Sequence, residues 1–290
     1  MTPALSPISS CPRSALRFDR VIVADWSAAS ALSPARPSSN AIWLGDTTEA
    51  GTITTYHRSR HSAEASLSAA IAAAKTSGTS LLIGFDFPMG YPAGFAEALT
   101  GQTSAAAVWA YMASHLSDDA QNRNNRFEVA AQINARLGPL FWGRPAHLAL
   151  PDLPTTKQPA YQIIAERRRV ETLVPRAQPV WKLYTTGAAG SQGLIGQAMI
   201  HRLAPSAAVW PFQPPAQVTL AEVYPSLLAR AVKADSAQIK DEAQVRLLAR
   251  ALFTLSHLGQ LAPLLKTPDI AREEGWILGA GHSAALEAAL

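Results

Sequence analysis

Three hydrophobic runs in the chain each carry an acidic residue at or near their end. The runs at 21–24, 81–85 and 218–223 carry Asp25, Asp86 and Glu222 respectively. Short apolar runs bounded by turn residues such as Pro88 are typical of buried strands. An isolated carboxylate is costly to remove from water, so each acid needs a partner or a metal ion. The pattern predicts three carboxylates gathered at one edge of a sheet.

The remaining pattern predicts two more strands and two long helices. Residues 41–45 and 52–56 are short apolar segments separated by a turn, which favours an antiparallel hairpin. Residues 62–75 are rich in Ala and Leu and are expected to form a helix that Ser62 caps and Gly78 ends. A last helix is expected over 239–257, where apolar residues recur at helical spacing.

A long insertion is expected at about 90–215, and it is predicted to be mostly helical. The segment 124–134 indicates a helix with Asn residues at its start. Residues 167–169 are three consecutive arginines, either a solvated helix face or a contact to a nucleic-acid backbone. A loop rich in Gly, Thr and Ser at 185–192 follows Lys182; it lacks the Lys-Ser/Thr pair of a phosphate-binding loop, which favours an ordinary loop.

Composition limits the classes of protein to consider. The 290 residues are 48% hydrophobic, which suits one large domain with a normal core. A formal net charge of +4 is compatible with an anionic substrate. The single cysteine, Cys11, excludes an internal disulfide and a cysteine-based zinc site. No apolar stretch is long enough for a membrane span, and residues 1–18 are expected to be a disordered extension, so we expect a cytoplasmic protein.

The order of predicted elements, with the motifs ADWSAAS (24–30), GFDFPMG (84–90), AEVYPSL (221–227) and IKDEAQ (239–244), resembles an uncharacterised family of predicted ribonuclease H-like nucleases. The resemblance covers about 21–89 and 218–280. It implies an α/β fold with a mixed five-stranded sheet, flanking helices and the insertion, forming a single domain over 19–290. It also implies that Asp25, Asp86 and Asp241 bind a divalent metal, with Glu222 as a fourth catalytic acid.

Further motifs, among them NNRFEVAA (124–131) and EGWILG (274–279), are similar to a bacterial group labelled as involved in molybdopterin guanine dinucleotide synthesis. The residues themselves give no chemical support for that label. One departure from the nuclease pattern is Gln244, which stands one helical turn after Asp241 where a second helical acid is common.

The acids match the chemistry of Mg²⁺ or Mn²⁺, which prefer oxygen ligands and activate water for phosphodiester cleavage. The alternative is that each acid caps a helix or pairs with an arginine. The candidate substrate-binding residues, each with an equally ordinary structural role open to it, are Ser27, Asn125, Arg126, Lys182 and Lys240.

Three functions follow from the sequence. The first is a metal-dependent nuclease or phosphodiesterase acting on nucleic acid or a nucleotide. The second is actin-like phosphoryl transfer, which the Trp-Ser-Ala after Asp25 and the short chain disfavour. The third is a non-catalytic or small-nucleotide-binding protein in cofactor metabolism. The choice among DNA, RNA and a small nucleotide stays open, as does the oligomeric state.

Overall fold

The computed structural model describes residues 16–290 except 160, 175 and 186. Most of the expected extension at 1–18 therefore lies outside the described residues. Its last residue, Phe18, is fully buried in the core, and its backbone N–H donates a hydrogen bond of 2.6 Å to Ser256 Oγ. The folded part of the chain thus begins at or before Phe18.

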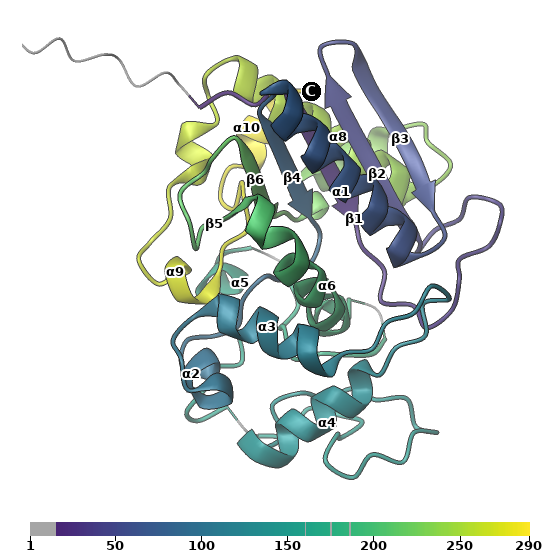
Figure 1. The fold of residues 1–290 in the computed structure, drawn as a ribbon, viewed down its shortest axis with the longest axis vertical. Helices are drawn as coiled ribbons and strands as arrows, with labels where there is room; N and C mark the ends of the chain where they lie inside the picture. Colours follow the sequence, from purple (N-terminus) through teal and green to yellow (C-terminus); the bar gives the residue numbers. More distant parts are fainter. Residues whose placement is uncertain (1–15, 160, 175, 186) are drawn as a thin grey trace, which may run out of the picture.

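A six-stranded mixed sheet forms the centre of the fold (Figure 1). Its order is β3-β2-β1-β4-β6-β5, with antiparallel pairing among the first three strands and parallel pairing from β1 onward. The strands are β1 (Arg20–Asp25), β2 (Ile42–Thr48), β3 (Gly51–His57), β4 (Leu81–Phe85), β5 (Ala208–Trp210) and β6 (Val218–Glu222). The hairpin predicted at 41–56 is confirmed.

The prediction of five strands was wrong by one strand. The additional strand, β5, is three residues long and pairs in parallel with β6 at the edge of the sheet. A run of three residues is too short to show an alternating pattern, so the sequence does not distinguish this strand from the rest of the insertion.

Helices cover both faces of the sheet because successive residues of its strands point to opposite sides. On one face, Ile22 and Ala24 of β1 pack in a cluster with α1 (Arg60–Ser77) and with the apolar side of α6 (Ala189–Leu203). On the other face, Val21 and Val23 pack against α8 (Lys240–His257). The helices predicted at 62–75 and 239–257 are thereby confirmed.

The ends of α1 differ in part from the prediction. Ser59, and not Ser62, caps the helix, because its hydroxyl accepts a 3.2 Å hydrogen bond from the backbone N–H of Ser62. Gly78 ends the helix as predicted, with the positive φ of 75° that glycine adopts without steric cost.

Close approach of α8 to the sheet requires a glycine in β2. A Cβ atom on Gly45 would stand 2.5 Å from the carbonyl oxygen of Val245, in the backbone of α8. The absence of a side chain at Gly45 therefore lets α8 lie directly on β1 and β2. This contact fixes where the first turn of α8 points.

The expected insertion consists of two structurally different parts. Its first part is a layer of short helices beyond the carboxyl ends of the parallel strands, with its own core around Tyr91, Phe95, Phe141 and Trp181 (Figure 1). This layer contains α2 (Phe95–Thr100), α3 (Ala105–His115), α4 (Arg126–Leu137) and α5 (Arg169–Leu173). Its second part, α6 and β5, belongs to the sheet and its covering helix.

The remaining short elements lie mainly after β6. They are η1 (Ala204–Ser206), η2 (Pro225–Leu228), α7 (Ala229–Ala234), η3 (Ala262–Leu265), α9 (Ala271–Glu274) and α10 (Ser283–Ala288). Among the helices of the described residues, none is long and apolar enough to cross a bilayer.

Candidate functional site

Three of the predicted acids end neighbouring parallel strands. Asp25 is the last residue of β1, Asp86 directly follows β4, and Glu222 is the last residue of β6. The strands are in register at this edge: Ala24 lies opposite Phe85, and Phe85 lies opposite Glu222. The backbone N–H of Asp86 donates to Ala24 O at 2.9 Å, which extends the ladder by one residue. The three acids therefore lie side by side at one sheet edge.

The fourth predicted acid, Asp241, reaches the same place from the other face of the sheet. It lies in the first turn of α8, where a negative charge interacts favourably with the helix dipole. Its Oδ2 accepts a 2.6 Å hydrogen bond from the backbone N–H of Asn40 in the loop before β2. Lys240 precedes it and borders the same space.

All four acids line one cavity of about 960 Å³ between the sheet edge and the insertion layer. Pockets of roughly 300–1,000 Å³ hold small ligands and cofactors in other proteins. The same cavity is also lined by basic, hydroxyl and amide side chains, namely Arg126, Arg176, Lys182, Tyr184, Ser191, Gln192, Tyr224 and Ser226. The cavity thus contains both acidic and basic side chains.

Burial and mutual repulsion make two of the acids hard to ionise. Burial, followed by the charges of Glu222 and Asp241, raises the pKa of Asp86 to about 7. Burial, followed by the charges of Asp86 and Asp241, also raises the pKa of Asp25 well above its usual range. Lys240 opposes both shifts. A divalent cation between these carboxylates would relieve the repulsion that one lysine does not balance.

Glu222 differs from the other acids because an arginine already neutralises it. Arg168 donates from Nη1 and Nη2 to the two carboxylate oxygens of Glu222 at 2.7 and 2.6 Å, and the backbone N–H of Met89 donates at 3.0 Å. Nε of Arg168 also binds Glu171 at 2.8 Å. Both carboxylate oxygens of Glu222 are therefore occupied, which leaves Asp25, Asp86 and Asp241 as the acids open to a cation.

The three-arginine segment at 167–169 is neither a solvated helix face nor a basic patch. Arg168 is 2% exposed and forms the ion pairs just described. Arg169 is exposed, and its backbone N–H binds Glu274. The spacing of Arg168 and Glu171 predicts an ion pair, but nothing in the local sequence indicates that the pair is buried beside Glu222.

The five candidate substrate-binding residues divide into two groups. Ser27, Arg126, Lys182 and Lys240 border the cavity, whereas Asn125 does not. Asn125 instead accepts from the backbone N–H of Ser117 and donates to His115 O, which holds the loop before α4. The hydroxyl of Ser27 donates to Asn40 O at 3.0 Å and thereby joins the two loops that flank Asp25.

The carboxylate oxygens of the site are the ligand type that a hard divalent ion prefers, although the side chains are not gathered around one point. Within the described ranges, no group of three or more His, Cys, Asp and Glu side chains is arranged as a metal site. Among those residues no side chain donates a hydrogen bond to Asp25 or Asp86, although the backbone of Trp26 binds the Asp25 carboxylate, and both acids line the cavity. Carboxylates beside room for water are what Mg²⁺ and Mn²⁺ require. Asp25, Asp86 and Asp241 are the residues that would hold such an ion.

No family model matches the chain, and no curated protein or solved structure matches it either.

Proposed function

We propose that this protein is a metal-dependent phosphodiesterase or nuclease of ribonuclease H-like type that acts in the cytoplasm. The observation that carries the proposal is the meeting of Asp25, Asp86 and Asp241 at one wall of a ligand-sized cavity. The strand order, with an antiparallel hairpin beside parallel strands and an acid-bearing helix on one face, agrees with the ribonuclease H-like resemblance of the sequence.

In this proposal Asp25, Asp86 and Asp241 would hold Mg²⁺ or Mn²⁺. A bound ion of this kind supplies an activated water and neutralises the charge that develops on phosphate oxygens. Lys240 adds a positive charge beside the acids, and Arg126 contributes a second one to the lining of the same cavity. The surrounding insertion layer encloses the substrate and orients its phosphate, which lowers the entropic part of the barrier.

The alternative function is a non-catalytic or small-nucleotide-binding protein in cofactor metabolism, such as that of molybdopterin guanine dinucleotide. Two observations favour it. Gln244, which lines the cavity one turn after Asp241, offers a neutral amide where a second helical carboxylate is common. Glu222 is bound on both oxygens by Arg168. Asp25, Asp86 and Asp241 remain open, whereas Glu222 is occupied and position 244 carries an amide. A site with fewer open carboxylates holds a second ion less tightly.

The test is a titration of Mg²⁺ and Mn²⁺ by calorimetry on the wild type and on Asp86→Asn. It is combined with a cleavage assay on single-stranded, duplex and hybrid nucleic acids and on nucleotide esters. We expect binding in the wild type that Asp86→Asn abolishes, together with cleavage that depends on the metal. Asp269→Asn, at an exposed acid away from the cavity, is the matched control and should bind metal normally.

Metal binding without any cleavage would favour the nucleotide-binding alternative. A wild type that binds neither ion at millimolar concentration would overturn the assignment of the three acids.

A further inference from the structure

Arg126 is a buried arginine without an acidic partner. It is 8% exposed and starts helix α4. Nε donates to Ser191 Oγ at 2.9 Å, and Nη1 donates to Ser30 Oγ at 2.8 Å and Asn124 Oδ1 at 2.7 Å. These acceptors are all neutral. No hydrogen bond from its Nη2 is found among the described residues, and Arg126 lines the cavity.

The other two buried arginines of the described chain are neutralised by carboxylates. Arg60 binds Asp118 through Nε and Nη2 at 2.6 and 2.5 Å, and Arg168 binds Glu222 through both terminal nitrogens. Burial of an unpaired charge costs several kcal/mol, so proteins normally place an acid beside it. Arg126 has no such direct ion pair among the described residues; the more distant charges of Glu128 and Asp118 and the ring of Phe127 only partly offset the cost of its burial. An anionic ligand would supply the missing partner.

The guanidinium of Arg126 is also held in a fixed position relative to the acids. Ser30 belongs to the loop that follows Asp25, and Ser191 lies in the first turn of α6, where its hydroxyl donates to Leu183 O. The neighbouring Gln192 donates from its amide to the backbone oxygen of Trp26, the residue after Asp25. The same two segments therefore position Arg126 and the strand end that carries Asp25.

A second cation lines the same cavity. Arg176 is exposed and forms no ion pair within the described residues. A planar guanidinium binds two phosphate oxygens at once, which a single ammonium does not. The arginines of the cavity are therefore suited to a phosphate group.

We infer that Arg126 binds a second phosphate group of the substrate, apart from the phosphodiester that is cleaved. This inference rests on the proposed function. The favoured substrate is accordingly a phosphodiester that carries an additional phosphate, and not an uncharged ester. In the reaction, a water oxygen bonds to phosphorus, the ester P–O bond breaks, the leaving oxygen receives the electron pair of that bond, and one proton of the water passes to the leaving oxygen or to solvent.

Two chromogenic esters that differ in one phosphate test the inference. They are thymidine 5′-(4-nitrophenyl phosphate) and the same compound with a 3′-phosphate. We expect the wild type to prefer the 3′-phosphorylated ester by about tenfold or more in kcat/KM, the range of a hydrogen bond between charged groups. Arg126→Gln should bring this ratio close to one, and Arg126→Lys should give an intermediate ratio because it keeps the charge without the planar fork.

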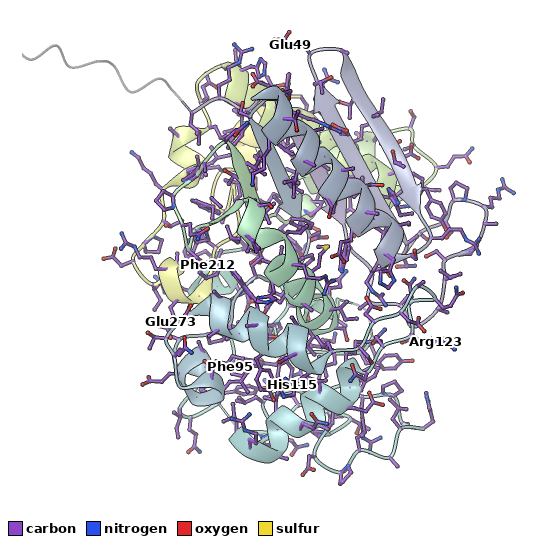
Figure 2. The ribbon with its side chains drawn as sticks, in the orientation of Figure 1. Glu49, Phe95, His115, Arg123, Phe212 and Glu273 are labelled. Atoms are coloured by element: carbon purple, nitrogen blue, oxygen red, sulfur yellow. The ribbon has the colours of Figure 1, made fainter. Side chains whose placement is uncertain are left out.

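Arg123→Gln is the matched control. Arg123 lies three residues before Arg126, at the outer edge of the molecule in Figure 2, where it pairs with Asp119 on the surface. The control should keep the wild-type ratio. If Arg126→Gln lowers kcat/KM equally for both esters, or melts far below the wild type while keeping the ratio, Arg126 has a structural role and the inference is overturned.

A binding measurement separates this inference from the proposed function. Calorimetry with thymidine 3′,5′-bisphosphate and thymidine 5′-monophosphate, in EDTA and in Ca²⁺, does not require turnover. A wild type that hydrolyses neither ester but prefers the bisphosphate through Arg126 would refute the phosphodiesterase and support the phosphate site. Equal affinity of the wild type for both nucleotides would overturn the phosphate site even if the esters are cleaved.

Discussion

Arg168 links four parts of the chain at the level of single residues. Its guanidinium binds Glu222 at the end of β6 and Glu171 in α5, and its Nη1 also reaches Glu274 O at 3.3 Å in α9. The backbone N–H of Met89, after β4, joins the network through Glu222. The hydrogen bonds of the buried guanidinium are thus met by two carboxylates. Removal of any one of these three groups would leave a buried charge without its partner.

We predict that Arg168→Met destabilises the protein by about 3–5 kcal/mol, because it leaves two buried carboxylates unpaired. Urea unfolding at neutral pH measures the change. Arg169→Met, at the exposed neighbour, is the control and should alter stability by less than about 0.5 kcal/mol. Equal stability of the two variants would show that the network contributes nothing.

The sequence allowed the acids that line the cavity to be predicted, but only some of its basic residues. Asp25, Asp86 and Glu222 end hydrophobic runs, and the pattern of such runs is local. Burial of Arg168 and the unpaired state of Arg126 depend on which segments meet in space. Loops at 117–125 and 176–188 have no periodicity from which their position against the sheet can be derived.

At the level of elements, the contact between α8 and β2 decides where Asp241 lies. Gly45 leaves no space for a Cβ atom, since the backbone of Val245 occupies it. The main chain of α8 therefore lies in direct contact with β2. The predicted α8 was correct in its bounds, but this close approach was not visible in the sequence, because a glycine within a strand has several explanations.

We predict that Gly45→Ala costs about 1–3 kcal/mol of stability, because the added methyl group forces α8 away from β2. It should also weaken Mg²⁺ or Mn²⁺ binding, since Asp241 moves with α8. Thermal unfolding and calorimetry measure the two effects. Thr55→Ala, at an exposed position of the adjacent strand β3, should cost less than about 1 kcal/mol and leave metal binding intact.

For the whole molecule, the raised pKa of Asp86 connects stability to pH. In the metal-free folded protein Asp86 titrates near pH 7, whereas in the unfolded chain it titrates near its ordinary 3.8. Between these values the folded state binds more protons than the unfolded state. The contribution of Asp86 to the free energy of unfolding therefore falls as pH rises from about 4 to 7 and stays low above that range.

We predict that the wild type loses about 1–3 kcal/mol more stability than Asp86→Asn when the pH is raised from 5 to 8 in EDTA. Acids whose pKa is lowered, such as Asp235, are present in both proteins, so their effects cancel in the difference. Mg²⁺ should restore the wild type at pH 8 and leave the variant unchanged, because only the wild type binds it. Urea unfolding curves at the two pH values measure this, and identical pH dependence in both proteins would contradict it.

The contact of α8 with the first strand also has a consequence for the order in which the protein is made. Asp25 and Asp86 leave the ribosome early, whereas Lys240 and Asp241 belong to a helix near the end of the chain. In that same helix, Ser256 accepts a hydrogen bond from the backbone N–H of Phe18. Chains emerge from the ribosome with their amino-terminal end first. Asp25 and Asp86, which repel each other, are therefore synthesised long before α8 can pack beside them. The proposed binding of a metal would thus be the last property that the nascent protein acquires.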